Sequence, residues 1–352
     1  MKYCFRFPVV KGIQAGNVYY IAMVPLNMIS KLFADEEYVL PEFRAQRRLN
    51  ENRIPEIKRY ILENRMSYVF SALAASIDGD FQFIQSENED VGILEVDMNA
   101  RFLINDGQHR KAAILGALEE DQSLGDETIS VVFFEDKGLN RSQQMFTDLN
   151  KHAVKTSNSL AELYDSRDPL AVITRETIMN NYFLNEYTDK EKDNLGKYSS
   201  NLFTLNLFYK ANKRIFGRKT ISASDKVFLE LFWNAVVKNM TPWIELRNKE
   251  ISKKDLRENY ISTQGVVIQA LGRIGEYICV NKLNADDVLS KLRDINWKRS
   301  SIDWKNRAIR PNGRIIASET AILLTANQIK NKLGIALSEE EKIKEKSIQL
   351  ID

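Results

Sequence analysis

The stretch Phe102-Leu103-Ile104-Asn105-Asp106-Gly107-Gln108-His109-Arg110 passes from an apolar run into a polar turn centred on glycine. The residues that follow, Ala112-Ala113-Ile114-Leu115 and on to Leu118, have the apolar spacing of a helix. A glycine turn at a helix start points backbone N–H groups, an imidazole and a guanidinium toward one place, where the helix dipole favours negative charge. The sequence therefore predicts a strand, a turn and a helix, with a phosphate-handling site between them.

The length and composition are those of a globular protein with room for two domains. The chain has 352 residues, of which 44% are hydrophobic and 28% are charged. No apolar run approaches the roughly 20 residues that span a bilayer, and the first residues lack the apolar core of a secretory signal. Cys4 and Cys279 are far apart in sequence and form no metal-ligand cluster. We therefore expect a reduced, cytoplasmic protein with no membrane span and no metal site.

The first half of the chain mixes strand and helix patterns. Strands are predicted over 3–10, 17–24, 68–77, 81–84, 93–96, 101–104 and 129–134, with Asp78-Gly79 as a hairpin turn. Helices are predicted over 41–50 and 55–64, the second with a buried stripe of Ile54, Ile57, Ile61 and Leu62. The order strand, glycine turn, helix, strand indicates a βαβ-like unit, in which ligands gather at the carboxyl end of the strand.

The second half is predicted to be helical. Ser224 or Asp225 is expected to cap a helix with the apolar face Phe228, Leu231, Phe232, Ala235 and Val236. Another long helix is predicted over 263–280, and the charged tail after Leu337 is expected to form a solvated helix. The predicted fold class is α+β, with a mixed α/β domain over residues 1–160 and a mainly helical domain over residues 161–352.

Each residue of the polar turn suits the binding of phosphate. Gly107 lets the backbone approach a ligand, and Gln108, His109 and Arg110 can donate hydrogen bonds to phosphate oxygens. Asp106 can cap the helix or orient His109. In the competing interpretation, the turn is only a capped helix whose polar first turn faces water.

A second polar segment covers residues 141–152. Its apolar residues have helical spacing, and its end carries Asn150, Lys151 and His152. In one interpretation Asn150 and His152 fold back to complete the phosphate or nucleotide site around Gly107. In the other, Lys151 and His152 only complement the dipole at a helix C-terminus.

A third segment, residues 291–314, is basic and aromatic. It holds eight Lys or Arg against two Asp, with Trp297 and Trp304 between them. Because the net charge of the chain is only +2, contacts with nucleic acid must come from such a local patch. Cations interleaved with aromatic residues suit a nucleic-acid backbone, although a solvated charged face with tryptophans as core anchors fits equally well. The predicted DNA contacts are Lys298, Arg299, Lys305, Arg307, Arg310 and Arg314.

Several familiar catalytic patterns are missing from the sequence. It shows no Ser-His-Asp or Cys-His arrangement and no Gly-x-x-x-x-Gly-Lys phosphate loop. No acidic cluster beside the turn suits a metal-dependent nuclease. Function therefore has to be argued from the turn and the basic segment.

Several separated motifs occur in a specific order along the chain. They are Ile13-Gln14-Ala15-Gly16, Arg44-Ala45-Gln46-Arg47, Arg53-Ile54-Pro55-Glu56-Ile57, Phe70-Ser71-Ala72-Leu73, Ile104-Asn105-Asp106-Gly107-Gln108-His109-Arg110, Gln143-Gln144-Met145-Phe146-Thr147-Asp148-Leu149-Asn150, Ile295-Asn296-Trp297 and Asn312-Gly313-Arg314-Ile315. This set resembles the DGQHR-domain family, and within it the DndB family of DNA sulfur-modification proteins. The resemblance covers most of the chain, with residues 165–220 the least distinctive part.

That resemblance implies a role in bacterial DNA phosphorothioation, in which sulfur replaces a non-bridging phosphate oxygen. It implies transcriptional control of the modification genes through binding of double-stranded DNA near their promoter. The turn is also similar to the nucleotide-binding turn of the ParB/sulfiredoxin superfamily, which implies a ParB-like N-terminal fold and ATP or CTP as ligand. Gln108-His109 stands where ParB proteins often carry Glu-Arg, so the nucleotide and its hydrolysis are left open.

Three functional hypotheses follow. The leading one is a DNA-binding transcription regulator, in which residues 291–314 contact phosphates and the turn binds a nucleotide or a DNA phosphate. Its rival is a nucleotide hydrolase or DNA-nicking enzyme in which Asp106 positions water, His109 shuttles a proton and Arg110 stabilises phosphoryl charge. The third is a scaffold that docks other DNA sulfur-modification proteins through its helical half. DNA readers often form homo-oligomers to match two half-sites, but no heptad seam predicts one here.

Overall fold

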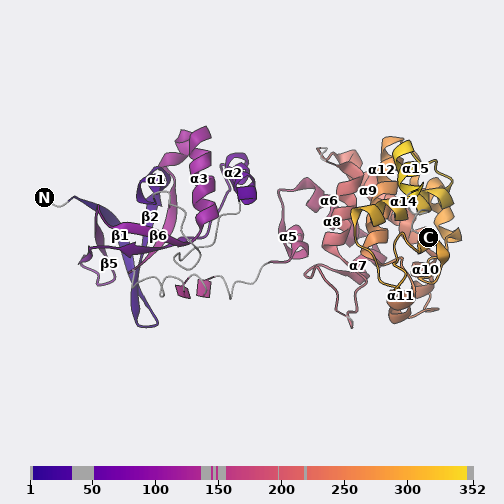
Figure 1. The fold of residues 1–352 in the computed structure, drawn as a ribbon, viewed down its shortest axis with the longest axis horizontal. Coiled ribbons are helices and arrows are strands. Elements are labelled where there is room, and N and C mark those ends of the chain that lie inside the picture. The colour runs from indigo at the N-terminus through magenta and orange to yellow at the C-terminus, as the bar shows by residue number, and fades with distance from the viewer. Residues whose placement is uncertain are drawn as a thin grey trace. The chain divides into compact units, whose positions relative to one another are not determined.

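The structure is a computed structural model that describes residues 3–33, 51–135, 144–145, 148–149, 156–196, 198–217 and 220–346. The chain divides into two compact units, Met1–Val154 and Lys155–Asp352, coloured indigo to magenta and pink to yellow in Figure 1. The first unit combines a sheet with helices and the second is helical, which confirms the α+β fold class. The helix predicted over 41–50 lies outside the described residues.

A seven-stranded mixed sheet forms the centre of the first unit. Its strands are β1 (Cys4–Gln14), β2 (Asn17–Pro25), β3 (Leu73–Asp78), β4 (Phe81–Gln85), β5 (Val91–Asp97), β6 (Arg101–Asp106) and β7 (Thr128–Glu135). The strand order is β4-β5-β1-β2-β7-β3-β6, in which β3 and β7 are parallel and all other neighbours are antiparallel. Alternate residues such as Ile129, Val131 and Phe133 of β7 are buried, as strand periodicity predicts.

The strands β3 to β6 form one long hairpin. One arm consists of β3 and β4, the other of β5 and β6, and each arm bends between its two strands. The expected hairpin turn at Asp78-Gly79 is wrong, because β3 pairs with β6 and β7 while β4 pairs with β5. The true turn lies over residues 86–90, where the Ser86 N–H donates to the Val91 carbonyl at 2.9 Å. Gly79 has a φ of +140°, and a Cβ there would lie 2.7 Å from that of Ala100 on the other arm. Glycine therefore lets the hairpin bend, so that its two halves join opposite ends of the strand order.

The helices of this unit are η1 (Leu26–Met28), α1 (Ile29–Leu32), η3 (Glu51–Arg53), α2 (Ile54–Glu63), α3 (Gln108–Glu120) and η4 (Gln122–Asp126). The predicted stripe of α2 packs on the core, with Ile61 fully buried, and α2 lies against α3 (Figure 1). The connection β6–α3–β7 is not the parallel crossover that a βαβ unit requires. β3 lies between β6 and β7, and β6 is antiparallel to it while β7 is parallel. The motif therefore lies where β6 ends and β3 begins.

The second unit packs its helices around a separate core. Its elements are α5 (Asn158–Tyr164), α6 (Pro169–Asn180), α7 (Tyr182–Tyr187), β8 (Thr188–Asp189), β9 (Phe203–Thr204), α8 (Leu205–Phe216), α9 (Ala223–Asn239), α10 (Thr241–Arg247), α11 (Lys253–Asn259), α12 (Gly265–Val280), α13 (Ala285–Leu289), η5 (Ser290–Asp294), η6 (Ile302–Trp304), α14 (Glu319–Leu333) and α15 (Glu339–Lys346). Gly272 of α12 lies against the backbone of Ala211 in α8, so these two central helices cross closely. Among the described residues, no helix is both long enough and apolar enough to cross a membrane.

Two helix details of this unit differ from the sequence-based expectation. α9 begins earlier than expected, because Ser222 is its N-cap and Asp225 completes a capping box from the third helical position. Its buried face is accordingly shifted: Leu229 is fully buried, whereas Leu231 is 60% exposed. The predicted helix over 263–280 is confirmed as α12.

The charged tail helix α15 is not solvated on all sides. Glu341 is buried and forms an ion pair with Lys330 of α14, with an Nζ–Oε1 distance of 2.6 Å. Glu345 accepts hydrogen bonds from Asn327 and from Arg307. Two of its carboxylates, those of Glu341 and Glu345, thus attach this charged helix to the rest of the unit.

Candidate functional site

The turn at Gly107 has the geometry that only glycine accepts easily. Gly107 is the N-cap of α3, with φ +104° and ψ 15°. A Cβ at this position would collide with the side chain of Leu73. The predicted strand, glycine turn and helix are present, and the Lys111 N–H donates to the Gly107 carbonyl at 2.9 Å. The N-terminus of a 13-residue helix therefore starts at this turn.

Arg110 holds the two residues that precede β3, beside the turn. Its Nη1 donates to the carbonyl oxygens of Ser71 and Ala72 at 2.6 and 2.8 Å, and its Nη2 donates to Asp106 Oδ2 at 2.6 Å. The Arg110 side chain is only 16% exposed, against 41% for Asp106. Both carbonyls belong to residues just before β3, which begins at Leu73 and not at Tyr68 as the sequence suggested.

A pocket of about 500 Å³ opens in front of the turn. One side is made of Asp106, Gly107, His109 and Arg110. Phe70 contributes from the loop between α2 and β3. The side facing them is made by the start of α2, with Arg53, Glu56, Ile57 and Tyr60. The pocket therefore combines two aromatic rings, cationic groups and a helix N-terminus in a volume typical of small-ligand sites.

The α2 side of this pocket was missed from the sequence. Residues 44–59 carry both basic and acidic side chains, a composition that by itself indicates only a self-paired helix surface. The available signal was the spacing of Arg53, Glu56, Ile57 and Tyr60, which places all four on one helix face. Their position opposite residue 107 depends on the packing of α2 on α3, and no local pattern indicates it.

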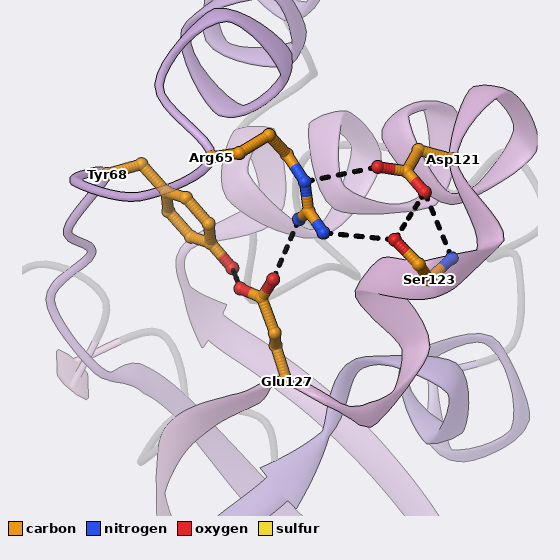
Figure 2. Close-up of polar contacts among 5 residues, drawn as sticks. All are labelled: Arg65, Tyr68, Asp121, Ser123 and Glu127. Carbon is orange, nitrogen blue, oxygen red and sulfur yellow. Dashed lines mark hydrogen bonds and ion pairs between the residues drawn. The ribbon is translucent and has the colours of Figure 1, made fainter.

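A polar network fixes the loop that carries Phe70 (Figure 2). The guanidinium of Arg65 contacts Asp121 at 3.1 Å, Glu127 at 2.7 Å and Ser123 Oγ at 3.1 Å. The Tyr68 hydroxyl donates to the same Glu127 carboxylate. Burial, and then this contact, raises the pKa of Tyr68 to about 12, while the Ser123 hydroxyl lowers the pKa of Asp121. The residues between α2 and β3 are thus tied to the segment before β7, which keeps the pocket wall in place.

The second polar segment is described only in small part. Met145 lies beside Asn105, the residue before the motif, with 3.3 Å between its sulfur and Asn105 Nδ2. Asn150 and His152 lie outside the described residues. That these two residues complete the pocket stays a prediction.

The tryptophans of the basic segment are core anchors. Trp297 and Trp304 are 2% and 0% exposed, and their rings stack with centroids 5.4 Å apart. The indole N–H groups donate to the carbonyls of Leu292 and Asn296. The aromatic residues therefore fix the path of the segment and are not available to stack on bases.

The six cations predicted to contact DNA fall into two groups. Arg299 donates to the carbonyls of Glu258 and Gly313, and Arg307 pairs with Glu345. The exposed group consists of Lys298, Lys305, Arg310 and Arg314. Arg310 and Arg314 flank a tight turn closed by hydrogen bonds between their own backbones and from Gly313 to Arg310, at 2.9 and 2.8 Å. The binding of DNA by Arg299 and Arg307 stays a prediction, since this structure shows both engaged with protein atoms.

Comparison with known families decides the affiliation of the chain. The DndB family model, described as DNA-sulfur modification-associated, matches residues 7–336. The chain belongs to the DndB family. The match covers the sheet of the first unit and the helices of the second through α14, so the association with DNA sulfur modification concerns both units of this DndB-family chain. No curated protein and no solved structure matches it.

The described residues contain no group of three or more His, Cys, Asp or Glu side chains arranged to hold a metal ion. The wider DGQHR and ParB parts of the sequence resemblance stay predictions.

Proposed function

We propose that this DndB-family chain is a DNA-binding transcription regulator of DNA sulfur modification, and that its helical unit contacts DNA phosphates through one loop. The contacting cations are Lys298, Lys305, Arg310 and Arg314. The observation that supports this is their exposure on a loop whose backbone the buried tryptophans hold. Cations on a fixed backbone lose less conformational freedom on binding than cations on a mobile tail. In this proposal Arg299 and Arg307 support the loop.

The salt dependence of DNA binding tests this proposal. We would measure the affinity for a double-stranded promoter fragment of the modification genes at several salt concentrations. Each lost phosphate contact should reduce the slope of log affinity against log salt by about one unit. Changing all four exposed cations to Gln should therefore lower the slope by about four units. Lys282→Gln, at an exposed lysine outside the loop, is the matched control, and an unchanged slope in the quadruple variant would overturn the proposal.

A second candidate function is nucleotide binding in the pocket at Gly107. It is favoured by the meeting of the α3 N-terminus, Arg53, His109 and the rings of Tyr60 and Phe70 in one cavity. The helix N-terminus and the cations suit phosphate groups, and the aromatic rings suit a base. ATP or CTP is the proposed ligand. Arg110 already contacts Asp106 and residues 71–72. Its role in this proposal is therefore to shape the pocket, in addition to any contact with phosphate.

Binding and turnover assays separate this ligand role from the rival enzyme hypothesis. Arg53→Gln should weaken ATP or CTP binding by about tenfold, as expected when one charged hydrogen bond is lost. Arg59→Gln changes an exposed arginine of α2, the helix that begins directly after Arg53, and should leave binding unchanged. Nucleotide hydrolysis or plasmid nicking that disappears in His109→Ala would favour the enzyme. Equal binding by Arg53→Gln and the unmodified chain would refute the pocket assignment.

A further inference from the structure

The helical unit contains a cavity of about 360 Å³ that neither proposal above uses. It lies where α8 and α12 begin, beside β9, α11 and residues 193–195. α8 has 12 residues with Thr204 as N-cap, and α12 has 16 residues with Gln264 as N-cap. Within the described structure, neither N-cap side chain hydrogen-bonds to its helix. The partial positive charge of two long helices is therefore directed at one cavity.

Buried polar side chains at this cavity lack a protein partner. Thr204, Asn206 and Thr263 line the cavity and are 7%, 6% and 6% exposed. Their side chains make no hydrogen bond to another residue that the structure describes. The polar atoms of these three side chains therefore face the cavity, where a polar ligand can take the place of water.

Two cationic residues line the cavity, Lys210 and Arg257, and Lys210 lies on α8 one turn after Asn206. Its acidic neighbour is Glu162, with Lys213 also near that carboxyl. Burial raises the pKa of Glu162 to about 8, with Asp193 contributing, so this carboxyl is mainly protonated at neutral pH. The charge of Lys210 is therefore not cancelled by Glu162.

The remaining charged residues of the cavity already have partners. Asp193 accepts from the backbone N–H groups of Asn158 and Ser159, both at 2.8 Å, and these bonds lower its pKa. Arg257 donates to the carbonyls of Gly196 and Ser199 at 2.9 and 3.0 Å. Asp193 thus serves the start of α5, and Arg257 holds the loop that forms one wall.

We infer that this cavity binds a phosphomonoester, whose phosphate group contacts Asn206, Thr263, Lys210 and the amide of Gly265 at the start of α12. A dianionic tetrahedral group satisfies the donors at the helix N-terminus and the lysine together. The cavity is larger than a phosphate ion needs, which leaves space for a small organic group. Such a group can belong to a free nucleotide or to the 5′ end of a DNA strand.

Calorimetric titration of the full chain with AMP and with inorganic phosphate tests the inference. We expect saturable binding that weakens by about tenfold in Lys210→Gln and in Thr263→Val, because each loses a hydrogen bond to a charged ligand. Lys213→Gln, on the same helix but outside the cavity, is the matched control. Short duplexes with 5′-phosphate or 5′-hydroxyl ends, titrated in parallel, distinguish a DNA end from a free nucleotide.

Two outcomes would overturn the inference. One is the absence of saturable binding of AMP and phosphate to the unmodified chain. The other is binding that Arg53→Gln removes while Lys210→Gln leaves it unchanged, since the anion would then occupy the pocket at Gly107. Lys210 is exposed, so its variant tests the site even if Thr263→Val fails to fold. Because the two pockets lie in different units, failure here leaves the nucleotide proposal standing.

Discussion

At the Gly107 turn, the guanidinium of Arg110 connects the start of α3 to residues 71–72 and to Asp106. A residue whose type suits phosphate binding therefore also connects two segments of the fold. Asp106 lies only four residues earlier, at a local helical spacing. Ser71 and Ala72 lie 39 and 38 residues earlier, so no local pattern could indicate them. The glycine was predictable because a strand, a turn and a helix meet there, whereas the direction of the guanidinium was not.

Arg110→Lys should destabilise the first unit. Lysine lacks the planar fork that reaches several acceptors, so the carbonyls of Ser71 and Ala72 lose partners in a half-buried place. We expect a loss of about 1–3 kcal/mol in the free energy of unfolding, measured by urea denaturation. Arg59→Gln, at an arginine with a side chain 70% exposed, should change stability little. Equal stability of the two variants would show that the Arg110 contacts contribute nothing.

Glu162→Gln should make the second unit more stable at alkaline pH. The pKa of Glu162 is raised from 4.5 to about 8, chiefly by burial. Between these values the folded chain keeps a proton that the unfolded chain releases, so stability falls as pH rises through this window. Gln cannot ionise, and its variant should lose this part of the pH dependence. Thermal unfolding from pH 5 to 9 is the measurement, with exposed Glu276→Gln as control, and parallel pH curves for all three proteins would contradict the expectation.

At the scale of elements, periodicity identified most strands but not their partners. The alternation in β1, β2, β5, β6 and β7 could be predicted because one face of each is buried. Asp78-Gly79 has the composition of a hairpin turn, yet it serves as a bend. Gly79 lies against Ala100, which belongs to the other arm of the longer hairpin. The composition of a turn alone does not distinguish a hairpin turn from a bend within one arm.

The tail helix α15 likewise has a contact that its own sequence does not indicate. Its sequence looks solvated because three glutamates begin it, and only one of them, Glu341, is buried against Lys330. Glu341→Ala leaves that lysine charge buried and unpaired, which should cost about 3–5 kcal/mol in the free energy of unfolding. Replacing both partners with Leu and Met should recover much of the loss. Exposed Glu340→Ala is the adjacent control, and chemical denaturation showing the same stability for both single variants would contradict the burial of the pair.

At the scale of the whole molecule, the two halves bury separate cores. One hydrophobic cluster runs from Phe7 to Phe133 and the other from Leu170 to Ile335, with no shared residue. The change from mixed to helical patterns along the sequence could be predicted from periodicity. The pocket residues could not all be found, since Arg53 and Tyr60 reach the Gly107 turn only through tertiary packing.

A fragment of residues 156–346 should fold without the first unit. Its helices from α5 to α14 pack on its own core, and α15 is attached to α14 through Glu341 and Glu345. The circular dichroism of the fragment should therefore be helical and its thermal unfolding cooperative. The reciprocal fragment, residues 1–154, provides the comparison for the sheet-containing unit. A fragment 156–346 that lacks cooperative unfolding would show that its core depends on the rest of the chain.

The bend in the long hairpin also governs how the sheet meets other chains. Its outermost strands, β4 and β6, have only five and six residues. A foreign strand that approaches either outer strand of the described sheet finds a short template, whereas the longer strand β1 lies inside the strand order between β5 and β2. Short outer strands of this kind disfavour edge-to-edge pairing between sheets.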